Sequence, residues 1–148
     1  MDKEKLNFRV AEREDIEGII KLCDECFEEK TNLDYAYRIF DENVNDKNQI
    51  YLVGEYDGDI IAHTKITVIP TIYENMNTYA ILNHVCVSPD FRRHNIATLM
   101  LDEVTKICKE HKCKTIELWS RNFRQAAHAC YLNYGFVIDD AKFFIKKI

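Results

Sequence analysis

Residues 81–100 read ILNHVCVSPDFRRHNIATLM, and this stretch decides the fold. It opens with an apolar run that ends at residues 85–87 and is stopped by the Ser-Pro-Asp turn at 88–90, as expected of a buried strand. An amphipathic helical pattern then begins at Ile96. The stretch therefore predicts a strand that leads, through a short basic loop, to the N-terminus of a helix.

The loop before this helix has the chemistry of an anion site. The first N–H groups of a helix have no intrahelical acceptor, and the aligned peptide dipoles place partial positive charge there. Arginine and histidine side chains add cationic donors at the same place. We therefore predict a pyrophosphate site made of Arg92, Arg93, His94, Asn95, Ile96, Ala97 and Thr98.

The composition bounds the class of protein. The chain has 148 residues, 47% of them hydrophobic, with four Gly and two Pro, so we expect a single domain over residues 1–148. A formal net charge of -5 argues against nucleic-acid binding and is compatible with an amine substrate. Because no run approaches a membrane span and no apolar leader follows Met1, we expect a cytoplasmic protein without membrane contact.

The cysteines are interpreted as small core residues. Six are present, mostly at apolar positions of helix or strand patterns. Cys23 and Cys26 have C-x-x-C spacing, but this is also the spacing of a helical apolar stripe, and no second pair or nearby His completes a zinc set. We therefore expect no metal.

The remaining patterns predict seven strands and four helices along the chain. Apolar alternation and turn signals place strands at 6–11, 49–56, 60–69, 79–87, 115–120, 136–137 and 143–148. Helical stripes lie at 15–27, 31–40, 96–112 and 124–134. Asp57-Gly58 is a strong hairpin signal between the second and third strands, and Gly135 is a natural stop for the last helix. The order is strand, two helices, three strands, helix, strand, helix, strand, strand.

A second motif lies in the last predicted helix. Residues 124–131 read RQAAHACY and are followed by YGF at 134–136. This segment resembles the RxxAHxFYxxxGF signature of the GNAT superfamily of N-acetyltransferases. The loop at residues 92–97 resembles the acyl-CoA motif of the same superfamily, Gln/Arg-x-x-Gly-x-Gly/Ala, with Asn95 in place of the usual Gly. Asn tolerates the left-handed backbone conformation, so we expect the loop to form.

The resemblance spans nearly the whole chain and implies a fold and an activity. The implied fold is α/β of the α+β kind, with a mixed, mostly antiparallel sheet of about seven strands flanked by four helices. The implied activity is transfer of the acetyl group of acetyl-CoA to a primary amine of a small molecule, such as an amino acid, amino sugar or polyamine, by direct attack in a ternary complex. Peptide or protein N-acetylation and a degenerate, non-catalytic CoA-binding module are the alternatives. Homodimers are common among the proteins that this chain resembles, and the sequence leaves its own oligomeric state open.

The same resemblance gives roles to several residues. Tyr131 would face the CoA sulfur, although an aromatic of the core is the alternative interpretation. A phenol with a pKa of about 10 is a weaker acid than a thiol of about 8.5, so full proton transfer would be uphill by roughly 2 kcal/mol, and a hydrogen bond to the thiolate is expected instead. The backbone of Val85, Cys86 and Val87 would bind the thioester and its developing oxyanion.

The general base is the point where the chain departs from the superfamily. Many members have Glu where this chain has Asn83, which cannot accept a proton, and His84 is the nearest titratable side chain. A structural role for His84, a base at His63 on the neighbouring strand, and a water relay held by Asn83 are the alternatives. Since side chains alternate along a strand, Asn83 and His84 should point to opposite faces unless a bulge intervenes.

Two further positions are implied by the resemblance. Asn122 would contact pantetheine, and the alternative is a turn or helix-capping Asn. The segment after the first helix would shape the acceptor pocket through Phe27, Glu28, Tyr35 and Tyr37, the alternative being core aromatics and solvated carboxylates.

Overall fold

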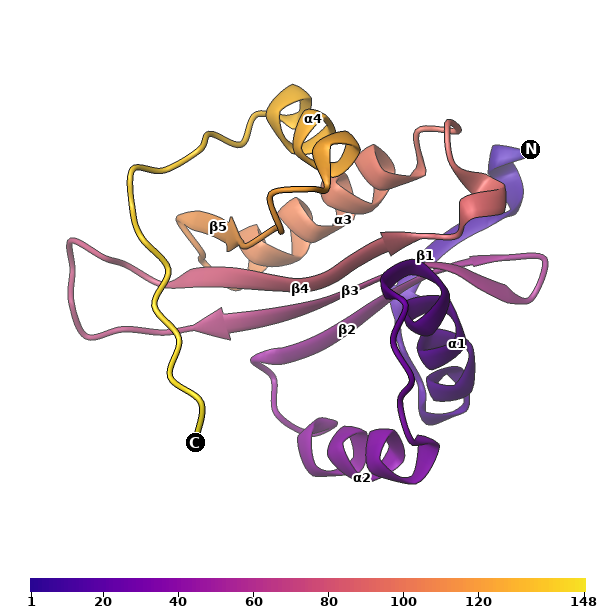
Figure 1. Ribbon diagram of the computed structural model, residues 1–148. Helices are drawn as coiled ribbons and strands as arrows, with labels where there is room; N and C mark the ends of the chain where they lie inside the picture. The colour runs from indigo at the N-terminus through magenta and orange to yellow at the C-terminus, as the bar shows by residue number, and fades with distance from the viewer.

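A computed structural model describes residues 1–148 and contains one sheet with helices on both faces (Figure 1). The strands are β1 (Leu6–Val10), β2 (Gln49–Tyr56), β3 (Asp59–Ile69), β4 (Tyr79–Val87) and β5 (Thr115–Leu118). The α-helices are α1 (Ile16–Phe27), α2 (Leu33–Asn43), α3 (Ile96–Glu110) and α4 (Gln125–Tyr134). None of these helices is long and apolar enough to cross a membrane.

The sheet is mixed and mostly antiparallel. Its five strands lie in the order β1-β2-β3-β4-β5, with antiparallel neighbours from β1 to β4 and a parallel pair between β4 and β5. Asp57 and Gly58 join β2 to β3 with φ values of 50° and 89°. Positive φ at both central residues is the geometry of a type I′ turn, whose twist matches that of the flanking strands. The expected hairpin is therefore confirmed.

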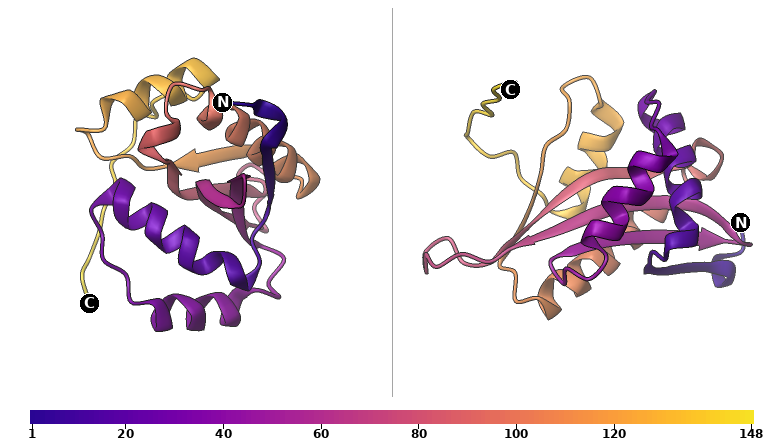
Figure 2. Two further views of the ribbon diagram at one scale, coloured as in Figure 1. Left: turned by 90° about the vertical axis from the view of Figure 1, so that its right-hand side faces the viewer. Right: turned by 90° about the horizontal axis from the view of Figure 1, so that it is seen from below.

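The helices form a layer on each side of the sheet, with α1 and α2 on one face and α3 and α4 on the other (Figures 1 and 2). The alternation of side chains along a strand explains how one sequence supplies both layers. In β2, Leu52 lies in the core on the α3 side and Val53 in the core on the α1 side. Both residues are almost completely buried, at 2% and 0% exposed.

The expected order of elements is confirmed as far as α4, including all four helices. The expected seven strands are wrong, because residues 136–137 and 143–148 form neither helix nor strand. The apolar run Phe143-Phe144-Ile145 is short, does not alternate and is followed by two lysines. A strand is stable only where it pairs and buries one face. Here Phe144 is 86% exposed and Phe143 is 58% exposed, with its ring 5.3 Å from that of Trp119 between centroids.

Candidate active site

Strands β4 and β5 separate part way along the length of β4. Their parallel ladder runs from the Tyr79 and Thr115 pair to the Leu82 and Leu118 pair, where β5 ends. Strand β4 continues to Val87 and pairs there only with β3. The chain therefore leaves a free edge of β4 next to the end of β5.

The backbone of this free edge offers at least one N–H donor. The Ser88 N–H donates to the Ile61 carbonyl of β3 at 2.8 Å. Because successive N–H groups of a strand point to opposite neighbours, the Val87 N–H points away from β3 and into the opening, whereas the Cys86 N–H points toward β3. This is the segment to which the resemblance assigns the thioester, and the N–H groups of Cys86 and Val87 point in opposite directions.

A β-bulge lies at the start of the opening. Lys65 pairs with Asn83 and His63 with Cys86, so β4 uses one more residue than β3 over this interval. The bulged segment of β4 contains His84, whose φ of 53° is a left-handed conformation that is uncommon for a residue with a side chain. The bulge reverses the side-chain alternation, so Leu82 packs on the α3 side but Cys86 on the α1 side.

The bulge leaves two of the three side chains considered for proton transfer on the surface. Asn83 and His84 are both exposed. The His84 Nε2 atom lies 3.2 Å from each carboxylate oxygen of Glu29, and the His84 ring meets the edge of Phe27 at 5.0 Å between centroids. Glu29 lies just beyond α1 and 55 residues before His84. Sequence reasoning missed Glu29, because no local pattern connects these positions.

His63 occupies a different environment. It is 3% exposed, and its Nδ1 atom lies 2.9 Å from the Leu52 carbonyl oxygen, which can only accept a hydrogen bond. Burial lowers the pKa of His63 to about 4, against a smaller opposite effect of the Leu52 carbonyl. This histidine is therefore neutral near pH 7, with its proton on Nδ1, and is enclosed by the sheet and α1.

The loop before α3 has the conformation expected for it. Arg93 and Asn95 have φ values of 66° and 64°. Asn95 thus adopts the left-handed conformation for which the superfamily uses glycine, and its carbonyl accepts the first helical hydrogen bond, from Leu99 N–H at 3.2 Å. The N–H groups from Arg93 to Thr98 have no acceptor within the protein. These donors and the exposed side chains of Arg92, Arg93 and His94 lie together at the helix N-terminus.

Two thiols lie next to this loop. The Cys26 thiol donates to the Val87 carbonyl at 3.5 Å, and the Cys86 thiol to the His63 carbonyl at 3.7 Å. The neighbouring Cys86 thiol lowers the pKa of Cys26 to about 7, and the Arg92 guanidinium acts in the same direction. All six cysteines are free, and no group of three or more His, Cys, Asp or Glu side chains could hold a metal ion.

Helix α4 brings Tyr131 to the other side of the opening. Burial raises the pKa of Tyr131 to about 12, and its ring meets that of Phe136 at 5.8 Å. The helix is anchored to α3 by the Tyr134 hydroxyl, which donates to Asp102 at 2.9 Å. Gly135 ends it with a φ of 116°, which places Phe136 back over Tyr131.

The residues just before α4 include a second side chain that sequence reasoning missed. The Arg124 guanidinium lies over the Phe27 ring at 4.6 Å and over the Phe123 ring at 5.3 Å. Asn122 lies in the turn that Arg124 N–H closes on the Arg121 carbonyl at 3.0 Å, and its side chain is exposed without a protein partner. The backbone geometry of Asn122 is that of a turn residue.

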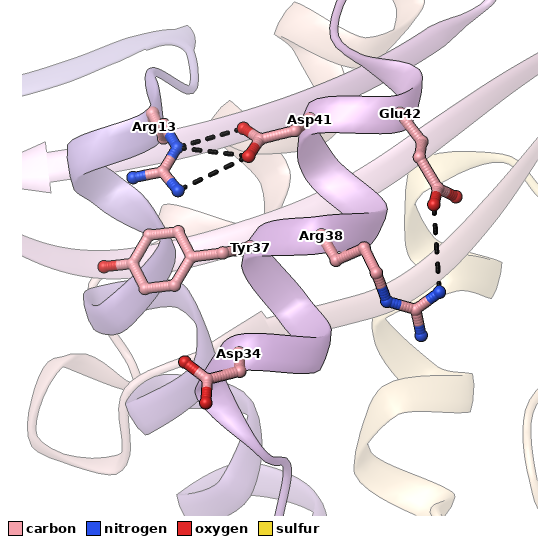
Figure 3. Close-up of a pocket in the computed structure, with 6 residues that line it drawn as sticks. All are labelled: Arg13, Asp34, Tyr37, Arg38, Asp41 and Glu42. Carbon is pink, nitrogen blue, oxygen red and sulfur yellow. Dashed lines mark hydrogen bonds and ion pairs between the residues drawn. The ribbon is translucent and has the colours of Figure 1, made fainter.

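A separate groove of about 540 Å³ lies on the outer side of α2 (Figure 3). Four of its charged side chains are paired, with Arg13 3.0 Å from Asp41 and Arg38 3.8 Å from Glu42, and Asp34 has no ion pair. Tyr37 belongs to this groove, beneath the Arg13 guanidinium at 4.5 Å. The groove contains neither a nucleophile nor an unpaired buried group, so it is not the candidate site.

The chain belongs to the acetyltransferase (GNAT) family, whose model matches residues 16–136. No curated protein sequence matches it. Three solved structures illustrate the likeness of fold. A predicted acetyltransferase from Clostridium acetobutylicum, solved with acetyl-CoA, is 22% identical, with a TM-score of 0.78 over 95% of this chain and 96% of that one.

The other two structures are enzymes with named substrates. Glucosamine-6-phosphate N-acetyltransferase from Arabidopsis thaliana is 17% identical, with a TM-score of 0.81 over 95% of this chain and 97% of that one. Aminoglycoside 6'-N-acetyltransferase from Acinetobacter baumannii is 18% identical, with a TM-score of 0.79 over 97% of this chain and 99% of that one. At these identities the likeness establishes the mixed α/β GNAT fold.

Proposed function

We propose that this chain is an N-acetyltransferase that moves the acetyl group of acetyl-CoA to a primary amine of a small molecule, by direct attack in a ternary complex. The observation that carries the proposal is the free edge of β4 beyond Leu82, which lies beside a helix N-terminus whose N–H groups have no acceptor. A thioester at the edge and a pyrophosphate at the N-terminus would use both sets of donors. Family membership supports this reading.

The loop before α3 would bind the pyrophosphate of acetyl-CoA, and the end of β4 would bind the pantetheine and thioester that follow it in the molecule. The pyrophosphate would accept hydrogen bonds from the N–H groups between Arg93 and Thr98, with Arg92, Arg93 and His94 adding positive charge. The segment from Val85 to Val87 and the exposed Asn122 amide would contact pantetheine and the thioester. The bound molecule supplies the activated acetyl group.

Val87 and Tyr131 would act on the two atoms that gain negative charge. The Val87 N–H points into the opening and would stabilise the thioester oxygen as the amine attacks. Tyr131, with a pKa of about 12, is a much weaker acid than a thiol of about 8.5, and full proton transfer would be uphill by about 5 kcal/mol. Tyr131 therefore stays protonated and donates a hydrogen bond to the leaving thiolate.

His84 would accept the proton that the amine loses. The Glu29 carboxylate can only accept a hydrogen bond, so the neutral His84 ring carries its proton on Nε2 and leaves the Nδ1 lone pair free. The proposed base thus has a partner that fixes its tautomer, as in other catalytic histidines. Asn83, exposed beside it, would hold a water or the substrate.

A small-molecule acceptor is favoured by the comparisons. The similar structures include enzymes named for glucosamine 6-phosphate and for aminoglycosides, which are small amines. We extend that substrate class to this chain. We also propose a single domain over residues 1–148, and a homodimer and a cytoplasmic location stay predictions.

The test is a transfer assay read by mass spectrometry, because this readout is undisturbed by protein thiols. The wild-type protein is incubated with acetyl-CoA and a panel of amino acids, amino sugars, polyamines and peptides. We expect acetylation of at least one small amine, reduced in Tyr131→Phe and His84→Ala and retained in the matched variant Tyr37→Phe, which lies in the outer groove. If peptides alone were acetylated, the acceptor would be a polypeptide and the proposed small-molecule acceptor would be wrong.

A binding measurement separates an enzyme from a non-catalytic module. A ligand at a hundred times its dissociation constant should stabilise the folded state by about 2.7 kcal/mol, which is measurable in thermal unfolding. Stabilisation by acetyl-CoA without any product would indicate a CoA-binding module. The absence of both stabilisation and product would contradict the proposed function altogether.

A further inference from the structure

Arg124 differs from the other half-buried arginine of the chain. Arg9 is also half-buried, and it holds Asp15 at 2.6 Å and Glu55 at 2.7 Å. Arg124 makes neither an ion pair nor a side-chain hydrogen bond. Its guanidinium instead lies over two aromatic rings, those of Phe27 and Phe123. A partly desolvated guanidinium without acceptors is an unfilled site for an anion.

The aromatic contacts hold the guanidinium in one place. Phe27 reaches it from the end of α1 and Phe123 from the segment before α4. A guanidinium that lies over ring faces keeps its N–H donors at its own edge, where a carboxylate or phosphate can accept two of them at once. Less side-chain freedom is lost on binding, because the arginine is already positioned.

The position of Arg124 connects it with the proposed reaction centre. The Phe27 ring that it covers also meets the ring of His84, at 5.0 Å. The positive charge of Arg124 also partly opposes the effect of burial on the pKa of Tyr131, so these two side chains are near each other. Arg124 thus lies near both the proposed base and the proposed thiolate donor, while the donors for the pyrophosphate belong to the separate loop before α3.

We propose that Arg124 binds an anionic group of the acceptor, so that the substrate is a primary amine that also carries a carboxylate or a phosphate. This inference rests on the proposed function and narrows its substrate class to α-amino acids and amino-sugar phosphates. The Glu29 carboxylate, which contacts His84, would attract the amine end before it loses its proton. Polyamines and neutral amino sugars would lack the contact with Arg124.

The test compares acceptors that differ only in the anionic group. An α-amino acid is measured against its carboxamide, and glucosamine 6-phosphate against glucosamine, so the two pairs distinguish a carboxylate from a phosphate. A charge-assisted, bidentate contact predicts kcat/KM about 10- to 100-fold higher for the anionic member of one pair. Arg124→Gln should abolish this preference by raising KM, Arg124→Lys should restore part of it, and the exposed Arg121→Gln should leave it unchanged.

Two results would overturn the inference. Equal kcat/KM values within both pairs would show that no anionic group is recognised. An equal loss of kcat for both members in Arg124→Gln would show that the guanidinium stabilises the thiolate instead. Thermal unfolding of Arg124→Gln verifies that the variant is folded.

A second readout needs no turnover. The Nε–H signal of Arg124 is followed by nuclear magnetic resonance during titration with each member of the two pairs, in the presence of CoA. We expect a shift with the anionic member alone. If this shift occurs without any acetylated product, the anion site stands and the proposed acetyltransferase activity fails. If neither member shifts the signal while acetylation proceeds, the anion site fails and the activity stands.

Discussion

The buried histidine beneath the bulge gives a stability prediction that is independent of catalysis. His63 is 3% exposed, and its ring has one protein partner, the Leu52 carbonyl at 2.9 Å. Protonation would place a positive charge in this apolar environment, and burial accordingly lowers the pKa of His63 to about 4. In the unfolded chain the same group titrates near its ordinary pKa of about 6.5.

The direction and size of the pH effect on the free energy of unfolding follow from the folded and unfolded pKa values of His63. Between about pH 6.5 and pH 4 the unfolded chain binds a proton at this position that the folded chain does not bind, so acid favours unfolding. The contribution of neutral His63 to stability is therefore complete above the pKa of the unfolded chain. It is lost as the pH falls toward the pKa of the folded chain. At about pH 4.5 this lowers the free energy of unfolding by about 2.5 kcal/mol relative to neutral pH.

The assay is urea unfolding at about pH 7.5 and about pH 4.5 on the wild type and His63→Asn. The Asn amide nitrogen can take the place of Nδ1 and donate to Leu52, but it does not titrate. We expect the wild type to lose about 2.5 kcal/mol more than the variant on acidification. His94→Asn, at an exposed loop position, should keep the wild-type dependence. An equal loss in wild type and His63→Asn would refute the view that His63 is buried and neutral.

Three further predictions concern other residues. Tyr131→Phe should lower kcat by about 10- to 100-fold at unchanged KM for acetyl-CoA, since only the thiolate gains the hydrogen bond, and an unchanged kcat in steady-state assays would contradict this. Glu29→Leu should lower kcat and mix the tautomers of His84, whereas Glu29→Gln keeps an acceptor and should retain the Nε2–H form, as read from the ring ¹⁵N shifts. Gly135→Ala should cost about 1 to 3 kcal/mol in urea unfolding, because φ is 116° there, and a cost near zero would show that the helix end relaxes.

Local signals in the sequence were sufficient for much of the fold. Asp57-Gly58 predicted a hairpin because few residue pairs accept positive φ at both positions, and both angles are positive. The resemblance to the acyl-CoA motif predicted a left-handed residue at position 95, which Asn tolerates, and its φ is 64°. Each of these positions carries its own conformational preference, so no distant contact was needed to infer it.

The features that could not be predicted depend on contacts between distant segments. The strand expected at 143–148 has strand-forming residues, but nothing pairs with it, and propensity alone does not form a strand. Glu29 and Arg124 enter the candidate site only because the end of α1 and the start of α4 meet around Phe27. The alternation of side chains along a strand indicates that a bulge would change the face of the sheet to which the His84 side chain points. The sequence does not show where such a bulge lies or which residue is extra.

Titration of the ¹⁵N-labelled protein with acetyl-CoA, followed through its backbone amide signals, tests the central claim most directly. The proposal places the pyrophosphate on the N–H groups from Arg93 to Thr98 and the thioester oxygen near the Val87 N–H. We expect the largest saturable shifts at those amides, with little change around the outer groove near Asp41. Unmoved signals at Val87 and the loop before α3, in a large excess of acetyl-CoA, would contradict the account.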